Sequence, residues 1–248
     1  YLKFKEERTL PAKDLLHRIE LEHPSRILDI GCGPGNSTRL LARRYPCASI
    51  LGIDSSENMI EAARRECPGI DFQLCDAQTG LAALGQDFDL VFSNACIQWI
   101  PDHRQLIPNM LSLLKPGGVL AVQMPVKQKE PIHQIIQRLA REERWRPRFP
   151  TPRIFYQLEE GEYFDLLAEH AADFSLWQIT YCHRMESHQA ILEWYRGTGL
   201  RPYLELLTKP EQEEFEAAVM ARLKEAYPIQ KNGEIIFRFP RLFFLAVR

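Results

Sequence analysis

The chain has 248 residues, of which 45% are hydrophobic and 26% charged, with a formal net charge of −2. This composition is typical of a globular protein and argues against nucleic acid as a partner, since the chain has no excess of positive charge and no dense basic run. No apolar run is long enough to span a membrane. We therefore expect a small molecule as the partner, with no nucleic acid and no membrane. We also expect a monomer.

The spacing of the six cysteines bears on the cellular compartment, and the first residue bears on where the natural chain begins. No two cysteines form a C-x-x-C pair, so a disulfide framework or a zinc site is disfavoured, and we expect a reducing cytoplasm and no metal. Because the numbering begins at Tyr1 and not at Met, we expect native residues to precede it.

Apolar runs alternate with helical segments over the first half of the chain. Short, almost continuously apolar strands separated by helices are typical of a parallel sheet that is covered on both faces. The expected strands are 27–30, 49–53, 71–74, 90–92 and 119–123, and the expected helices are 37–45, one that begins after Ser55 or Ser56, and one over 106–114, before a turn at 115–118.

The alternation ends near Lys127. A stretch rich in Arg, Glu and Pro (127–153) leads into mixed helical segments. Because proline cannot donate a hydrogen bond to a neighbouring strand, we expect the final strand to begin just after Pro240. The expected elements are a strand near 176–183, helices at 187–195 and 210–227, and a closing strand at 241–247.

The segment DIGCGPGN (29–36) follows the first strand. A glycine turn between a strand and a helix lets a ligand approach the backbone and the N–H groups of the helix N-terminus. The dinucleotide fingerprint needs a third small residue at position 36, where Asn36 stands. Asp29 would repel a pyrophosphate but suits an ammonium group, so the pattern favours S-adenosylmethionine, which carries no phosphate.

Acidic and polar residues follow the next strands. Asp54 ends the second strand, about 20 residues after the glycines, where a carboxylate binds ribose hydroxyls in this architecture. Taken alone, Asp54 could equally precede a helix as its cap. After the third strand, Asp76 could accept the adenine amine while the Ala77 N–H meets a ring nitrogen. Trp99 is either an apolar wall beside the reacting sulfur or a core residue.

Four segments together carry a family resemblance: DIGCGPGN, IDSSENMI, CDA and LKPGG. Over roughly residues 25–125 the chain resembles the class I S-adenosylmethionine-dependent methyltransferases. The resemblance implies a Rossmann-like, seven-stranded, mostly parallel sheet with helices on both faces and an antiparallel last strand. It also implies S-adenosylhomocysteine as product. The expected cofactor residues are Asp29, Gly31, Gly33, Gly35, Asn36, Asp54, Ser55, Met59, Asp76, Ala77, Asn94, Ala95 and Trp99.

A narrower resemblance covers nearly the whole chain. The segments YLKFKEER, SNACIQWIPDH, VLAVQMP, SHQAILEW, TGLRP and FPRLF resemble the trans-aconitate 2-methyltransferase family. The implied activity is O-methylation of one carboxylate of a small polycarboxylic acid. Two alternatives stay open: another acceptor, such as a different small acid or a carrier-bound malonyl group, and a sensor that binds the cofactor without catalysis. The expected organisation is an N-terminal cover segment (1–24), a cofactor core (25–125), a mainly helical substrate cover (126–235) with one core strand near 176–183, and a final core strand (236–248).

Methylation of a carboxylate requires no general base, because the acid is already ionised near neutral pH. Only a hydroxyl acceptor would need one, and His103 or His183 could then serve. The acceptor's remaining carboxylates need cationic anchors, for which the planar arginine fork is suited. For each arginine the alternative is a surface charge or a pair with a nearby acid, as Glu205 offers Arg201. The expected acceptor residues are Tyr1, Arg8, Trp99, His103, Tyr181, His183, Arg201 and Arg241.

Overall fold

The computed structural model describes residues 5–150 and 154–248. Within these ranges the chain forms two compact units. Unit 1 contains residues 5–7, 126–150, 154 and 179–241, and unit 2 contains residues 8–125, 155–178 and 242–248. The chain therefore passes between the units several times, and two long strands belong partly to each.

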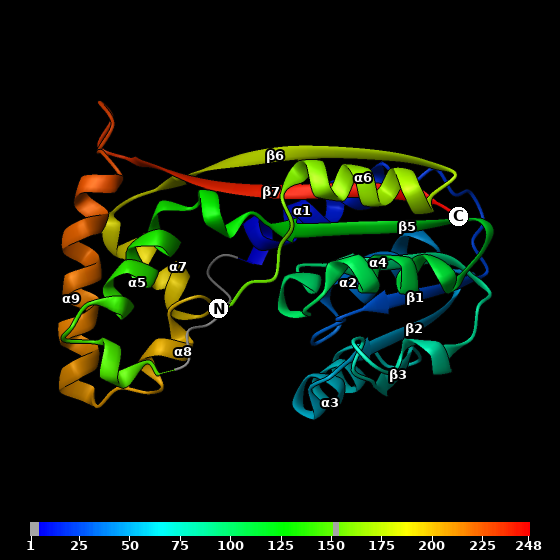
Figure 1. The fold of residues 1–248 in the computed structure, drawn as a ribbon, viewed down its shortest axis with the longest axis horizontal. Coiled ribbons are helices and arrows are strands. Elements are labelled where there is room, and N and C mark those ends of the chain that lie inside the picture. Colours follow the sequence, from blue (N-terminus) through cyan, green and yellow to red (C-terminus); the bar gives the residue numbers. More distant parts are fainter. Residues whose placement is uncertain (1–4, 151–153) are drawn as a thin grey trace. The chain divides into compact units, whose positions relative to one another are not determined.

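A seven-stranded sheet organises the molecule, with the order β3-β2-β1-β4-β5-β7-β6 (Figure 1). The first five strands pair in parallel, so their carboxyl ends meet at one edge. Strand β7 runs antiparallel to β5, because Val126 pairs with Pro240 while Gly117 and Gly118 pair with Arg248. The strands are β1 (Arg26–Ile30), β2 (Ser49–Asp54), β3 (Asp71–Leu74), β4 (Phe88–Asn94), β5 (Leu114–Pro125), β6 (Asp173–Met185) and β7 (Ile235–Val247).

The expected strands and their antiparallel last member are confirmed, with two local differences. Strand β7 begins at Ile235 and includes Pro240, which we had placed before its start. The Pro240 carbonyl accepts a hydrogen bond from the Val126 N–H. Proline cannot donate the return bond, and this interruption falls just beyond the end of β5, at Pro125. The expected turn at 115–118 lies inside β5 as an irregularity, where the pairing with β4 shifts and Gly117 has a positive φ of 78°.

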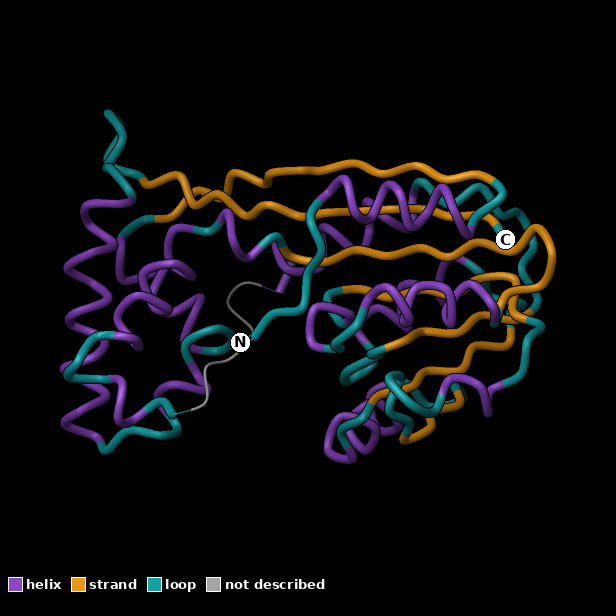
Figure 2. The backbone as a smooth tube through the Cα atoms, in the orientation of Figure 1, coloured by secondary structure: helices purple, strands orange, loops and turns teal. Residues whose placement is uncertain are grey.

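Helices accompany the strands in chain order. In Figure 1, α4 and α6 lie in front of the strands and α1 behind them, and Figure 2 separates helices from strands by colour. Helices α2 and α3 pack on β2, and α4 packs on β5. The helices are α1 (Lys5–His17), α2 (Asn36–Arg44), α3 (Glu57–Glu66), α4 (His103–Ser112), α5 (Pro131–Arg141), α6 (Glu160–His170), α7 (His188–Arg196), α8 (Arg201–Leu204) and α9 (Lys209–Ala226).

The observed units differ from the expected division of the chain. Residues 8–24 and the segment with α6 were expected in the cover, but both belong to unit 2. Helix α6 packs there because its buried Tyr163 bonds the ring of His103 and lies 6.0 Å from the ring of Phe244. A single boundary near residue 126 therefore does not divide the chain into the two units, because each unit is built from several segments that are distant in sequence.

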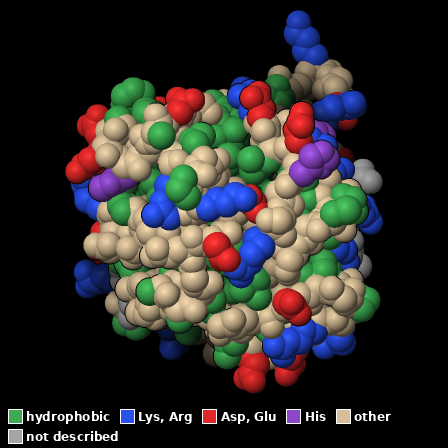
Figure 3. Space-filling view, turned by 90° about the vertical axis from the view of Figure 1, so that its right-hand side faces the viewer, with side chains coloured by type: hydrophobic (Ala, Val, Ile, Leu, Met, Phe, Trp, Pro, Cys, Tyr) green, Lys and Arg blue, Asp and Glu red, His purple; other side chains and the backbone are tan. Residues whose placement is uncertain are grey.

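The surface and thiols add three findings. On the face shown in Figure 3, basic and acidic side chains are interspersed and do not gather by sign. Each of the six cysteines is a free thiol. Within the described ranges, the helices are too short or too polar for any of them to cross a membrane.

Candidate functional site

Residues 31–35 connect β1 to α2 and form a loop that leaves its backbone accessible. Gly31 has a φ of +74°, and a Cβ at this position would lie 2.1 Å from the Cys96 sulfur. Gly33 has a φ of +53°, and a Cβ there would meet no atom within 4 Å. Packing thus requires glycine at position 31, while position 33 faces open space that a ligand can enter. We call this loop, together with Asp29 and Asp54, the cradle.

Asp54 stands at the carboxyl end of β2, beside the glycine loop. Its Oδ2 accepts a hydrogen bond from the Gly33 N–H at 3.0 Å, and its Oδ1 accepts one from the Ser56 N–H at 2.9 Å. Two backbone donors therefore fix the carboxylate in a half-buried position. Each oxygen retains a lone pair, so the group can still accept the two hydroxyls of a ribose. Orienting the chain before α3 and binding a ligand are compatible roles for this residue.

Asp29 lies deeper than the sequence suggested. We expected its carboxylate at the mouth of the site, but the side chain is fully buried in β1. Its Oδ2 accepts hydrogen bonds from the hydroxyls of Ser37 (2.8 Å) and Thr38 (2.7 Å), whereas Oδ1 is buried without a partner. Burial raises the pKa of Asp29 to about 6, although the two hydroxyls lower it. A cation that reaches Oδ1 would satisfy the atom and stabilise the ionised form.

The ends of β3 and β4 complete the site in unit 2. Asp76 is exposed and accepts a bond from the Gln78 N–H, while Ala77 is buried. Asn94 ends β4, and its side-chain oxygen is buried without a hydrogen-bond partner. Ala95 has a φ of +53°, an uncommon conformation for a residue with a Cβ, and its N–H bonds the Gln123 carbonyl at 2.8 Å. Backbone strain of this kind destabilises the folded state by roughly 1–3 kcal/mol, and strained residues are concentrated at functional sites.

The remaining expected cofactor residues occupy the same edge. Asn36 begins α2, whose N-cap Gly35 offers no side chain and whose first turn has no acidic residue. The N–H groups of this turn therefore keep their partial positive charge for a ligand. Ser55 is exposed before α3, Met59 is 41% exposed, and Trp99 is 41% exposed with its ring 4.5 Å from that of Phe155.

Four residues that support the cradle were missed by the sequence analysis. Ser37 and Thr38 donate hydrogen bonds to Asp29, and two hydroxyl residues in the first turn of α2, directly after the glycine loop, were a usable signal. The Ser93 hydroxyl bonds the Ile30 carbonyl at 3.0 Å and ties β4 to the end of β1. Cys96 packs against Gly31, and burial raises its pKa to about 12, so the thiol stays neutral. No local pattern indicates the last two contacts.

The cradle fits a nucleoside that carries a cationic group. A fixed carboxylate at Asp54 suits vicinal hydroxyls, and a buried oxygen of Asp29 without a partner suits a positive charge. The glycine loop allows close approach at Gly33. S-Adenosylmethionine has this combination of groups, so the residues present are compatible with the expected cofactor.

Three of the expected acceptor residues gather in unit 1 around the ring of Phe239. The guanidinium carbon of Arg241 lies 3.5 Å from the ring centroid, and the His183 ring lies 5.4 Å away. Tyr181 stacks on His183 at 6.2 Å. Arg241 is only 7% exposed, which is unusual for an arginine. Strands β6 and β7 bring these positions together although they are about 60 residues apart in the chain.

The other expected acceptor residues do not join this group. The Arg201 Nε donates to Glu205 at 2.6 Å on the surface, as the alternative interpretation proposed. Both ring nitrogens of His103 bond within the protein, one to Tyr163 and one to the Ile97 carbonyl, and burial lowers its pKa. Tyr1 lies outside the described residues, and so does the side chain of Arg8.

A buried polar network in unit 1 was also missed. Glu130 is fully buried, and its Oε2 accepts bonds from Lys127 (2.8 Å) and from the Tyr195 hydroxyl. Burial and the charge of Glu130 raise the pKa of Tyr195 well above its usual value. Lys127 also lies 6.0 Å from the centroid of Phe239, so the network adjoins the group around Arg241.

Comparison with known proteins gives consistent sequence matches. A family model described as a methyltransferase domain matches residues 27–118. The trans-aconitate 2-methyltransferase of Azoarcus sp. (strain BH72) is 45% identical over 100% of this chain and 97% of that protein. The enzyme of the same name from Shigella flexneri serotype 5b (strain 8401) is 46% identical over 100% of this chain and 96% of its own length.

Solved structures show the same fold at low sequence identity. The YcgJ protein from Bacillus aligns with a TM-score of 0.61 and 14% identity, over 96% of this chain and 98% of that one. Phosphoethanolamine N-methyltransferase 2 of Haemonchus contortus, in complex with S-adenosyl-L-methionine, aligns with a TM-score of 0.57 and 20% identity, over 96% of this chain and 52% of that one. At these identities the likeness establishes the fold.

Proposed function

The chain belongs to the trans-aconitate 2-methyltransferase family, and on this premise we propose that it transfers a methyl group from S-adenosylmethionine to a carboxylate of trans-aconitate. The product would be a methyl ester together with S-adenosylhomocysteine. The observation that carries the proposal is the full-length similarity to enzymes of that name, supported by a cradle whose donors and acceptors suit the cofactor.

The cofactor residues would act by binding and orientation. When bound, S-adenosylmethionine supplies an electrophilic methyl group at its sulfonium. Asp54 would accept the ribose hydroxyls while Gly33 and Ser56 hold its carboxylate in place. The buried Oδ1 of Asp29 would favour the positive charge of the ligand. Asp76 and the backbone of Ala77 remain our proposed contacts for adenine.

The acceptor carboxylate is already the nucleophile. Its pKa lies far below neutral pH, so no residue has to remove a proton. The protein's task is to align the attacking oxygen with the methyl group, and alignment of this kind can contribute roughly 7–11 kcal/mol. The bonding of both His103 ring nitrogens within the protein is consistent with a reaction that has no histidine base.

We propose Arg241 as the main anchor for a second carboxylate of the acceptor. Its guanidinium is buried over the face of Phe239, which restricts its orientation. In a poorly hydrated environment, the planar guanidinium group of an arginine binds a carboxylate strongly through two parallel hydrogen bonds. Tyr181 and His183 lie in the same group and could add hydrogen bonds. Arg241 would thereby help to select the acceptor.

Two further parts of the proposal concern the setting of the reaction. Six free thiols fit a reducing compartment, which supports the cytoplasm. The proposed partner is a small polycarboxylate, and we expect the enzyme to act as a monomer. Light scattering during size-exclusion chromatography would test the last point, since a dimer would double the measured mass.

A panel of small acids incubated with the enzyme and isotopically labelled cofactor would test the function. We expect labelled monomethyl ester from trans-aconitate and none from acids that lack its carboxylate arrangement. Labelling of another small acid or of a carrier-bound malonyl group alone would replace the proposed acceptor. Cofactor binding without any labelled product would instead indicate a sensor.

A further inference from the structure

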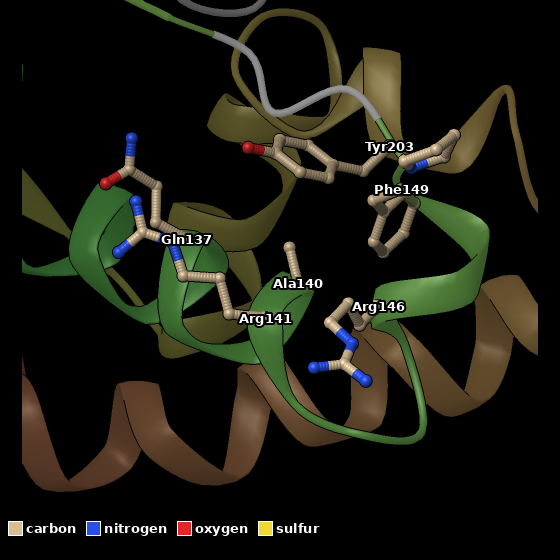
Figure 4. A pocket seen from close by; sticks show the side chains of 7 residues that line it. Gln137, Ala140, Arg141, Arg146, Phe149 and Tyr203 are labelled. Atoms are coloured by element: carbon tan, nitrogen blue, oxygen red, sulfur yellow. The ribbon is translucent and has the colours of Figure 1, made fainter.

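Unit 1 contains a second feature with the properties of a binding site. It is a pocket of about 210 Å³ between α5, the short 3-10 helix Arg146–Arg148 and α8 (Figure 4). One water takes up about 30 Å³ in the liquid, so the pocket has room for a ligand of several heavy atoms and not only for one small ion. The lining residues are Gln137, Ala140, Arg141, Arg146, Phe149, Pro150 and Tyr203.

The two arginines of this pocket are exposed and available to a ligand. Within the described part of the chain, the guanidinium groups of Arg141 and Arg146 have neither a hydrogen bond nor an ion pair. Among the other described arginines of unit 1, Arg138 and Arg238 also lack a hydrogen bond or ion pair but do not line the pocket, whereas six are each paired with a glutamate. These pairs are Arg144–Glu214, Arg148–Glu211, Arg184–Glu234, Arg196–Glu216, Arg201–Glu205 and Arg222–Glu142.

The arrangement places the cations on two sides of an apolar floor. Figure 4 shows the guanidinium of Arg141 beside the amide of Gln137, and that of Arg146 on the other side of Ala140. The rings of Phe149 and Tyr203 form the wall above, with centroids 5.1 Å apart in an edge-to-face contact. This geometry suits a ligand with two separated anionic groups and a carbon skeleton between them.

We propose that this pocket binds a small polycarboxylate anion, one carboxylate at Arg141 and Gln137 and another at Arg146. Guanidinium groups bind carboxylates in a planar, bidentate manner, and the Gln137 amide can donate a further hydrogen bond. Inorganic phosphate has one compact charge and no apolar skeleton, so it would use only one of the two arginines. The site does not depend on methyl transfer, and the anion could be the acceptor itself or a polycarboxylate that is never methylated.

Binding of the saturated probe tricarballylate, measured by calorimetry without cofactor, tests the site directly. The variants are the double substitution Arg141→Gln/Arg146→Gln and the matched control Arg138→Gln, whose exposed arginine lies on the same helix but outside the pocket. We expect at least a tenfold weaker affinity in the double variant and less than a twofold change in the control. Amide NMR shifts at Ala140 and Phe149 should accompany binding in the wild type and disappear in the double variant.

Steady-state kinetics then distinguish the two sources of the anion. If the pocket holds the acceptor, the double variant should raise the KM for trans-aconitate with little change in kcat or in cofactor affinity. If it holds a separate effector, KM should stay constant while the influence of tricarballylate on the rate disappears. Equal binding by wild type and double variant, or phosphate binding as tight as that of tricarballylate, would overturn the proposal. Because the probe binds without cofactor, failure of the methyl-transfer assay would leave this test unaffected.

Discussion

Replacing Asp29 by Asn should stabilise the protein at neutral pH and weaken its hold on the cofactor. The side chain is fully buried, and burial raises its pKa from about 3.8 to about 6. At about 1.4 kcal/mol for each tenfold change in proton affinity, the ionised form costs the folded state roughly 3 kcal/mol. An asparagine avoids this cost, and its oxygen can still accept from Ser37 and Thr38.

The expected gain in the free energy of unfolding is smaller than the full cost of burying the ionised carboxylate. The asparagine NH₂ would occupy the place of Oδ1, which has no partner, and an unsatisfied buried donor costs about 1–3 kcal/mol. We therefore expect Asp29→Asn to raise the free energy of unfolding by up to about 2 kcal/mol at pH 7. Between pH 4 and pH 6 the folded wild type binds more protons than the unfolded chain, so its stability falls as pH rises. The advantage of the variant should consequently disappear as the pH is lowered to 4.

Urea unfolding followed by circular dichroism at pH 4 and pH 7 measures this difference. Asp89→Asn is a control of opposite sign, because hydrogen bonds from Lys115, the Arg26 N–H and Ser25 outweigh burial and lower the pKa of Asp89 to about 2. That variant should be less stable at pH 7, with a loss that shrinks only as the pH falls towards 2. An Asp29→Asn protein that is less stable than the wild type at pH 7, or whose advantage persists at pH 4, would refute the reasoning.

Three further substitutions test the cradle and the acceptor group. Asp54→Ala should weaken S-adenosylhomocysteine binding by about tenfold or more, because charge-assisted hydrogen bonds are lost. Arg201→Ala should leave this binding unchanged. Equal losses of affinity in calorimetry would contradict the assignment of Asp54. Gly33→Ala should lower the free energy of thermal unfolding by about 1 kcal/mol, because position 33 has a positive φ. It should reduce cofactor affinity far more, since the added Cβ would fill the open side of the loop. Unimpaired affinity would show that no ligand approaches there. Arg241→Ala should raise the KM for trans-aconitate about tenfold with cofactor affinity intact, and an unaltered KM would remove Arg241 from the acceptor site.

Local sequence patterns were sufficient to predict most of the structure in the cofactor-binding part of the chain. Strands β1, β2 and β4 have short apolar runs, and the glycines at 31, 33 and 35 all have positive φ. Asp54 could be placed at a strand end by counting from the glycines, and it lies against Gly33. These features depend on residues near one another in sequence, or on strands that follow each other in a regular alternation.

Predictions about the single side chains expected at the acceptor site were less successful. Arg201 and Arg241 occupy similar resemblance-bearing segments, yet one pairs with Glu205 on the surface and the other is buried over Phe239. His103 was expected among the acceptor residues, but it is buried, and the hydroxyl of Tyr163, 60 positions away, forms a hydrogen bond with one of its ring nitrogens. Sequence periodicity carries no information about which distant segment packs on a given residue.

The amino-acid sequence by itself determined the alternating strands and helices, the exposed glycine backbone and the acid at the end of β2. These features follow from backbone conformational limits and from hydrophobic periodicity, which act over a few residues. Only the tertiary structure decided that Asp29 is buried with one oxygen unsatisfied, that Pro240 lies within a strand, and that α6 packs in unit 2. Burial and hydrogen bonding at these positions depend on chain segments brought together from far apart, because desolvation depends on the complete set of neighbours.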